Sequence, residues 1–268
     1  MLLRSKIVHL NSTNSFKPPF INLSQASQAL RDSGFALLSP HDFSQLTLHE
    51  LNDWQAIERS WSDLAPDEYL KDGGKYRKRR HASLIVQESQ IQITPYRPHW
   101  QPLSYNALHG GINRWFEPCE TDFLSSLAVR NLILQLGKLF NEVHQRNQPT
   151  WFVEVHQFRI DTANGIGRPT PEGAHRDGVD FVAVLMVQRH KITGGESRVF
   201  DATGPQGQRF TLTSPWTLLL LDDTKVIHET TPIQPEDRNH PENSWRDTLV
   251  LTYRSSGFLD NHDQPHIE

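Results

Sequence analysis

Hydrophobic positions recur with a helical period along the longest apolar stretch in the first half of the chain. Apolar residues stand at positions 124, 127, 132, 136, 139, 140 and 143, which places them on one face of a helix. This spacing predicts the longest helix of the protein over 121–144. Shorter helices are predicted over SQASQALRDSG, which ends in a glycine, and over TLHELNDWQAIERSWSDL.

The pattern changes after residue 150. Short runs rich in Val, Leu, Phe and Thr are separated there by Gly, Pro, Asn and Asp, which is typical of antiparallel strands joined by turns. The predicted strands are WFVEVHQFRI, FVAVLMVQ, SRVFD, RFTLT, TLLLLDD, KVIHETTPI and RDTLVLTYR, with earlier ones in FALLS, HASLIVQ and QIQIT. Such a set of strands favours a double-sheet jelly roll.

These elements predict a mainly β, α+β fold with a double-stranded β-helix core. A length of 268 residues suits one domain with elaborations, because β barrels of this size commonly form a single unit. We expect 1–268 to be one domain, with a helical and mixed supporting portion over 1–150 and the jelly-roll core over 151–255. Residues 256–268 form a polar tail, and its end, NHDQPHIE, is expected to fray.

Composition narrows the class of protein. A hydrophobic content of 36% and a charged content of 22% are typical of soluble globular chains. The formal net charge of −4 gives no reason to expect nucleic acid or an anionic membrane as a partner. No apolar run approaches the ~20 residues of a membrane span and no signal peptide is evident, so a cytoplasmic location is expected. Cys119 is the single cysteine, which excludes an internal disulfide and a multi-cysteine zinc site.

Any metal must therefore be bound by histidines and carboxylates, and the segment EGAHRDGVDF offers both. His175 and Asp177 stand two positions apart, so in an extended segment their side chains point to one face. Pairs of this kind also arise by chance, at His240 with Glu242 and at His266 with Glu268. Only the first pair leads into an apolar strand, which would hold its side chains in place.

His228 is the best candidate for a third ligand. It lies in the β-type run KVIHETTPI, and the 50 residues that separate it from Asp177 leave room for several strands and a return to the same end of a barrel. Two histidines and one carboxylate form the facial triad of non-haem Fe(II) oxygenases, which leaves coordination positions open. Structural zinc sites close their ligand shell instead. The three residues therefore predict an iron centre with room for a co-substrate and dioxygen.

A co-substrate such as 2-oxoglutarate needs a cation for its second carboxylate. Arg246 begins the strand RDTLVLTY, and its planar guanidinium can bind a carboxylate through two hydrogen bonds. Thr248 lies on the same strand face and can add a hydroxyl. Taken alone, Arg246 is equally well explained as a solvated charge at a strand end. Beside the triad we prefer the 2-oxoglutarate role, with Arg238 and Arg254 as the alternatives.

Together these motifs resemble the bacterial 2-oxoglutarate-dependent dioxygenases that hydroxylate free L-amino acids, such as L-isoleucine and L-leucine dioxygenases. PTPEGAHRDGVDFV, GGESRVFD, VIHETTPI and RDTLVLTYR carry the resemblance, which extends upstream through YRKRRHASL, YNALHGGINRWFEP and WFVEVHQFRI. It covers roughly 70–255. The resemblance implies Fe(II) on His175, Asp177 and His228, and 2-oxoglutarate held by Arg246. It also implies that O2 converts 2-oxoglutarate to succinate and CO2 while an aliphatic C–H is hydroxylated, or a thioether sulfoxidised, on leucine, isoleucine or methionine.

Substrate contacts are predicted from strand faces. Gln157 and Arg159 share one face of WFVEVHQFRI and are expected to point into the cavity, with a surface salt bridge as the alternative. His156, on the other face, is interpreted as a core or interface histidine. In KYRKRRH, Arg77 and Arg79 share a face, and one of them could reach an anionic substrate.

The alternative for Arg77 and Arg79 is a charged strand edge that prevents aggregation. Phe181 is a candidate for the apolar wall of the substrate site, and ordinary core packing is its alternative. KYRKRRH could also contact phosphates of nucleic acid, but no wider basic surface supports that hypothesis.

Two other functions remain in view. A cupin-like metal enzyme that does not use 2-oxoglutarate would have no need for a carboxylate clamp at Arg246. A non-catalytic β-sandwich binding module would bind no iron.

Overall fold

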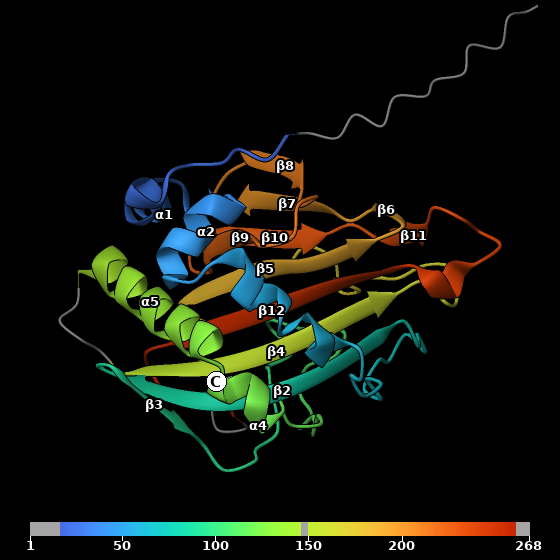
Figure 1. Ribbon diagram of the computed structural model, residues 1–268, viewed down its shortest axis with the longest axis horizontal. Helices are drawn as coiled ribbons and strands as arrows, with labels where there is room; N and C mark the ends of the chain where they lie inside the picture. Colours follow the sequence, from blue (N-terminus) through green and yellow to red (C-terminus); the bar gives the residue numbers. More distant parts are fainter. Residues whose placement is uncertain (1–16, 146–149, 261–268) are drawn as a thin grey trace, which may run out of the picture.

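The computed structural model describes residues 17–145 and 150–260. The predicted fraying of NHDQPHIE, residues 261–268, lies outside the described residues, and so does the chance pair His266 and Glu268. Within the described part, strands dominate and helices are fewer and mostly short (Figure 1). The predicted mainly β fold is therefore confirmed.

Seven antiparallel strands form the large sheet of the molecule. Their order is β1 (Phe35–Leu38), β9 (Thr217–Asp222), β5 (Phe181–His190), β12 (Trp245–Arg254), β4 (Trp151–Asp161), β2 (Arg77–Gln87) and β3 (Gln90–Ile93). β12 lies in the centre and pairs along its length with β4 and β5 (Figure 1). The segment over 1–150 thus supplies three of the seven strands, and the division at residue 150 and the single domain stay predictions.

A smaller sheet lies across a cavity from the large one. It consists of β10 (Val226–Thr230), β7 (Glu196–Asp201) and β8 (Gly207–Thr211), and β6 (Ile192–Gly194) pairs separately with β11 (Ile233–Pro235). Side chains of β10 and of the large sheet line the same cavity, so the two sheets form its opposite walls. This arrangement is the predicted double-stranded β-helix core.

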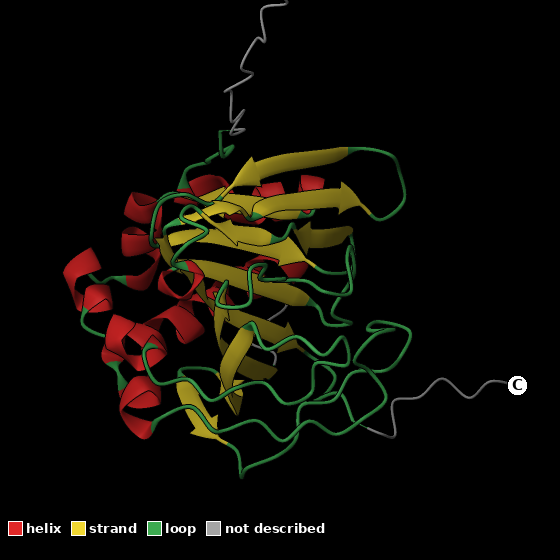
Figure 2. Cartoon of the chain, turned by 90° about the vertical axis from the view of Figure 1, so that its right-hand side faces the viewer, coloured by secondary structure: helices red, strands yellow, loops and turns green. Residues whose placement is uncertain are grey.

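The helices gather on one side of the large sheet, away from the cavity (Figure 2). They are α1 (Ala26–Ser33), α2 (Pro40–Thr47), α3 (Leu51–Gln55), α4 (Thr121–Ser125) and α5 (Leu127–His144), with 3-10 turns at η1 (Leu23–Gln25) and η2 (Glu58–Trp61). A further 3-10 turn, η3 (Pro241–Asn243), stands in the loop between β11 and β12. None of the helices in the described ranges is long and apolar enough to cross a membrane.

Two helix predictions need correction. The segment 47–64 forms only the short α3 and the turn η2, and the long helix over 121–144 is interrupted at Ser126, whose backbone is extended in ψ at 130°. α2 was not predicted, although its start carries recognisable signals. Ser39 accepts a hydrogen bond from the Asp42 amide, and Pro40 occupies the first helical position.

Alternation along the central strand separates an apolar core from the cavity. On β12, Leu249, Leu251 and Tyr253 belong to the core beneath the helices, while the residues between them line the cavity. Phe181 also packs in this core, where its ring stacks on Phe140 with centroids 4.3 Å apart. Its predicted place in the substrate wall is therefore wrong.

Candidate metal centre and cavity

Backbone pairing brings the first and third predicted ligands together. The His175 amide donates to the His228 carbonyl at 3.0 Å and the His228 amide donates back at 2.9 Å, forming an isolated antiparallel bridge. His228 belongs to β10, whereas His175 stands in the loop that precedes β5. Residues far apart in the sequence thereby present their side chains to one wall of the cavity.

The three side chains converge with distances suited to one metal ion. Asp177 Oδ1 lies 3.7 Å from His175 Nε2, and Asp177 Oδ2 lies 3.3 Å from His228 Nε2. Their potential ligand atoms all fall within 4.8 Å of one another. The predicted juxtaposition of His175, Asp177 and His228 is thus present in the structure.

The hydrogen bonds of these histidines leave the correct atoms available. His175 Nδ1 lies 2.9 Å from the Gly173 carbonyl, which can only accept, so the proton is on Nδ1 and Nε2 offers a lone pair. His228 Nε2 is buried and makes no hydrogen bond. A buried imidazole nitrogen that makes no hydrogen bond, facing a carboxylate at 3.3 Å and close to a second imidazole, fits the donor set of an Fe(II) site.

The protonation of the site without a metal follows from the same contacts. Burial alone would raise the pKa of Asp177, but the adjoining His175 and His228 rings hold it well below its usual range. Burial would lower the pKa of His175, but Asp177 and Glu172 raise it to about 10. Metal binding must therefore displace a proton from His175, which makes the affinity depend on pH.

A buried aspartate shapes the loop that carries Asp177. Asp223 accepts hydrogen bonds from the amides of Asp177 at 3.0 Å, Gly178 at 2.8 Å and Val179 at 3.2 Å. Gly178 has a φ of 80°, and a Cβ there would collide with the ring of Tyr105. Sequence reasoning did not single out Asp223, which appears only as the last residue of TLLLLDD.

A chain of polar side chains orients the Asp177 carboxylate from the other side. Gln101 Nε2 donates to Asp177 Oδ1 at 3.2 Å, and Gln101 Oε1 accepts from Arg114 at 2.8 Å and from Asn106 at 3.2 Å. These contacts join the segment 101–114 to the metal loop. The contact between Gln101 and Asp177 spans 76 positions, so no local pattern in the sequence could have indicated it.

Arg246 faces the same cavity, and its side chain has no hydrogen-bond or ion-pair partner among the described residues. It is 4% exposed, its Nε makes no hydrogen bond, and no ion pair joins it to a described residue within 4.0 Å. Burial lowers the pKa of Arg246 to about 10, which still leaves it charged at neutral pH. A buried guanidinium without a counter-charge is costly, so this position is suited to an anionic ligand.

The other residues predicted to bind the distal carboxylate of 2-oxoglutarate lie in different parts of the structure. Thr248 lines the cavity beside Arg246. Arg238 is exposed in the loop before η3, and Arg254 donates to the Gly257 carbonyl at the far end of β12. Of the three arginines considered for the carboxylate, only Arg246 lines the cavity.

The predicted substrate residues of β4 point the wrong way. Gln157 Nε2 donates to Ser60 Oγ at 2.9 Å on the helical side, and Arg159 forms an ion pair with Asp247 at 2.6 Å. Neither lines the cavity. The prediction chose the wrong face of the strand, because its opposite face, which includes His156, forms the cavity wall. His156 lines the cavity, yet it is buried and its Nδ1 accepts a hydrogen bond from Arg79, so it is a satisfied buried histidine, as interpreted.

The two arginines of β2 do line the cavity. Arg77 Nε donates to Asp67 at 2.7 Å, so its charge is already paired. The Arg79 guanidinium lies between two phenyl rings, 3.7 Å from the centroid of Phe116 and 4.3 Å from that of Phe158. These contacts fix its orientation within the wall.

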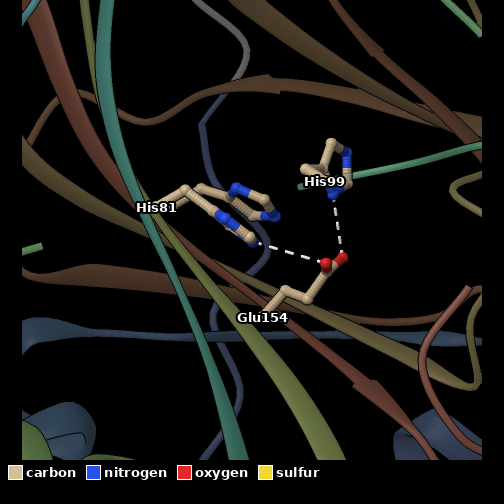
Figure 3. Close-up of side chains that lie close together, drawn as sticks. His81, His99 and Glu154 are labelled. Atoms are coloured by element: carbon tan, nitrogen blue, oxygen red, sulfur yellow. Dashed lines mark hydrogen bonds and ion pairs between the residues drawn. The ribbon is translucent and has the colours of Figure 1, made fainter. Parts of the chain in front are cut away.

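A second group of histidines and a carboxylate lies in the same wall and was not predicted. Glu154 Oε2 is 2.9 Å from His99 Nδ1, and Glu154 Oε1 is 3.3 Å from His81 Nε2 (Figure 3). His156 completes the group, with its ring stacked on His81 at 4.8 Å. All four residues are buried. Residue types and distances alone would allow a metal here as well.

Comparison with known proteins identifies the class of protein that this fold and site define. The model of the 2OG-Fe dioxygenase family matches residues 58–252, which is most of the chain, and the protein belongs to this family. Its members use Fe(II), 2-oxoglutarate and O2, so the predicted cofactors are confirmed at the level of the family. A search of curated proteins found no match.

Solved structures support the same assignment. A bsmA homolog from Methylobium petroleophilum PM1 is 48% identical, with a TM-score of 0.85 over 93% of this chain and 99% of that one. IDO from Bacillus thuringiensis is 16% identical, with a TM-score of 0.71 over 90% and 99%. The Fe(II)/(alpha)ketoglutarate-dependent dioxygenase TqaL is 17% identical, with a TM-score of 0.65 over 87% and 86%. The last two likenesses show the fold alone.

Proposed function

We propose that this protein hydroxylates an aliphatic C–H bond of a free L-amino acid, or sulfoxidises a thioether, in a reaction that consumes 2-oxoglutarate and O2. His175, Asp177 and His228 would hold the Fe(II), and Arg246 with Thr248 would hold the distal carboxylate of 2-oxoglutarate. The observation that carries this proposal is the buried, unpaired Arg246 in the same cavity as the three metal-ligating side chains.

Iron and 2-oxoglutarate supply the oxidising chemistry when bound, and the protein supplies positions and charges. The triad would hold the iron, while Gln101 donates to the Asp177 carboxylate and Asp223 accepts from the amide of the same residue. Arg246 would neutralise one carboxylate of 2-oxoglutarate. The enclosed position of these groups keeps bulk water away from the reacting atoms.

The remaining wall supports an aliphatic substrate side chain. Val179 follows the metal loop, Val182 and Val184 project from β5, and Val250 projects from β12 into the cavity. These branched side chains offer an apolar surface to a leucine, isoleucine or methionine side chain. The same cavity carries charged groups of both signs, which suits the zwitterionic end of a free amino acid.

The two alternatives are less well supported. A cupin-like enzyme that does not use 2-oxoglutarate leaves the unpaired Arg246 unexplained. A non-catalytic binding module leaves the buried, unbonded Nε2 of His228 unexplained.

A mass-spectrometric assay tests the proposal directly. The protein is incubated with Fe(II), 2-oxoglutarate, O2 and, separately, L-leucine, L-isoleucine or L-methionine, and both succinate and oxygenated amino acid are measured. We expect at least one amino acid to gain one oxygen atom in step with succinate, and His228→Ala to give neither product. Succinate without oxygenation of any L-amino acid would refute the substrate class, and absence of succinate in every mixture would refute the reaction.

A further inference from the structure

Three carboxylates of described residues line the cavity, and their partners separate them into different roles. Asp177 belongs to the metal triad. Glu154 is already committed, because each of its oxygens lies against a histidine nitrogen, Oε2 at 2.9 Å from His99 and Oε1 at 3.3 Å from His81 (Figure 3). The third carboxylate is Glu172, and it is the one whose charge is least satisfied.

Glu172 Oε2 is buried and makes no hydrogen bond, and Oε1 lies 3.5 Å from His175 Nε2. The side chain is 13% exposed. If His175 binds iron through Nε2, that nitrogen is no longer available to Glu172 Oε1. Oε2 has no hydrogen-bond partner among the described residues in either case, and a buried carboxylate oxygen without one costs free energy unless a ligand donates to it.

Glu172 also lines two pockets. It lines the inner cavity and, together with His175, an outer pocket formed by residues of 104–108 and 171–176. The outer pocket is the more open of the two. Glu172 is therefore accessible from both the inner cavity and the outer pocket.

Arg114 provides the opposite charge. It is 2% exposed, its Nη2 donates to Gln101 at 2.8 Å and its Nε makes no hydrogen bond. Burial lowers the pKa of Arg114 to about 10, and Glu172 acts against this shift, so the two charges interact. No ion pair joins them within 4.0 Å. Complementary charges therefore face one cavity without contacting each other.

We propose that Glu172 binds the α-ammonium group and Arg114 the α-carboxylate of a free α-amino acid substrate. This inference rests on the proposed function and deepens it. A zwitterion bridging Glu172 and Arg114 would satisfy both charges at once. Its side chain would be left to contact the apolar surface of Val182, Val184 and Val250. An acyl group on the nitrogen removes the cation that Glu172 requires, so N-acylated amino acids should be poor substrates.

The test compares three probes that differ only at the polar end: L-leucine, its 2-hydroxy analogue and N-acetyl-L-leucine, with the isoleucine or methionine series used if leucine is not oxidised. Glu172→Gln keeps the shape of the side chain and removes its charge. We expect kcat/KM for the amino acid, relative to the hydroxy acid, to fall by about 10- to 100-fold in this variant, because a charge-assisted hydrogen bond is lost. KM for 2-oxoglutarate and the iron content should stay within twofold of the wild type.

Glu117→Gln, an exposed carboxylate on the surface, is the matched control and should change none of these values. For the other end of the substrate, Arg114→Gln should reduce the preference for L-leucine over L-leucinamide. Iron content is measured in parallel, since Arg114 also supports Gln101.

The outcomes separate this inference from the proposed function. If wild-type protein oxygenates the amino acid and Glu172→Gln keeps the full preference for ammonium over hydroxyl, the role of Glu172 is wrong while the reaction stands. Loss of iron in Glu172→Gln would also overturn the inference, because Glu172 would then serve the metal. If wild-type protein oxygenates none of the probes, the proposed substrate class itself fails.

Discussion

Two groups of histidines and carboxylates line one cavity, yet the hydrogen bonds and charges around them differ, and so do the roles that we expect for them. The first, His175, Asp177 and His228, stands on a loop and the small sheet. The second consists of His81, His99, Glu154 and His156, and it is built on β2, β4 and the segment around residue 99. By composition alone the second group is the richer in metal-ligating residues.

The positions of protons distinguish the two groups. In the second group, Arg79 Nη2 donates to His156 Nδ1 at 2.6 Å, so the proton of a neutral His156 ring is on Nε2 and no lone pair remains for a metal. Glu154 accepts from His99, and the Arg79 cation would repel a divalent ion. In the first group, the Nδ1 of His175 is bonded to a carbonyl, and the Nε2 atoms of His175 and His228 both face Asp177, with no described arginine bonded to either ring. Available lone pairs, rather than residue types, indicate a metal site.

The largest expected effect separates the two groups by iron content. Asp177→Ala should lower iron affinity by more than about 100-fold, beyond the usual effect of a residue that only orients a ligand, and abolish succinate formation. Glu154→Gln, measured beside it by iron analysis of the purified proteins, should retain full iron. Iron loss in Glu154→Gln with retention in Asp177→Ala would reverse the assignment of the two groups.

A smaller effect is expected for Arg246, a buried arginine of the same cavity. Arg246→Ala should raise KM for 2-oxoglutarate by about 10- to 100-fold, because a charge-assisted pair is lost, while iron remains bound. Steady-state succinate formation across 2-oxoglutarate concentrations measures this change. Arg238→Ala is the control, since Arg238 is exposed, and it should leave KM unaltered. An unchanged KM in Arg246→Ala would require another residue for the distal carboxylate.

The smallest expected effect is on how the free energy of unfolding depends on pH. Burial lowers the pKa of His99 to about 4, whereas an exposed histidine in the unfolded chain titrates near 6.5. Between these values the unfolded chain binds the proton and the folded protein does not, so the free energy of unfolding falls as the pH drops from about 6.5 towards 4. One such group contributes a slope of at most about 1.4 kcal/mol per pH unit.

Urea unfolding at pH 7 and pH 5.5 measures this slope, and His99→Gln should reduce it. Burial raises the pKa of Glu154 but its histidine neighbours lower it further, so Glu154 adds a loss of the same sign only below about pH 4.5. A slope that is identical in wild type and His99→Gln would show that His99 does not stay neutral in the folded protein.

The sequence could predict that His175, Asp177 and His228 lie together, because each stands in a strand or beside one with recognisable apolar neighbours. It could not predict which face of β4 points to the cavity. Alternation makes Gln157 and His156 equally plausible, and only the helices packed against one face of the large sheet decide between them.

Contacts between residues far apart in the sequence could not be predicted from local patterns either. Gln101 contacts Asp177 across 76 positions and Asp223 contacts its amide across 46. Phe181 was misplaced for a related reason, since a large apolar residue fits a substrate wall and a core equally well. Its stacking on Phe140 of α5 depends on how the long helix packs against the sheet.

The carboxylate of Asp223, which gathers three successive amides behind the metal loop, gives that loop a support that does not depend on iron. Together with the paired backbones of His175 and His228, it keeps the ligands assembled when the ion is absent. We therefore expect a chelator to remove iron reversibly, with this part of the chain staying folded while the metal is absent.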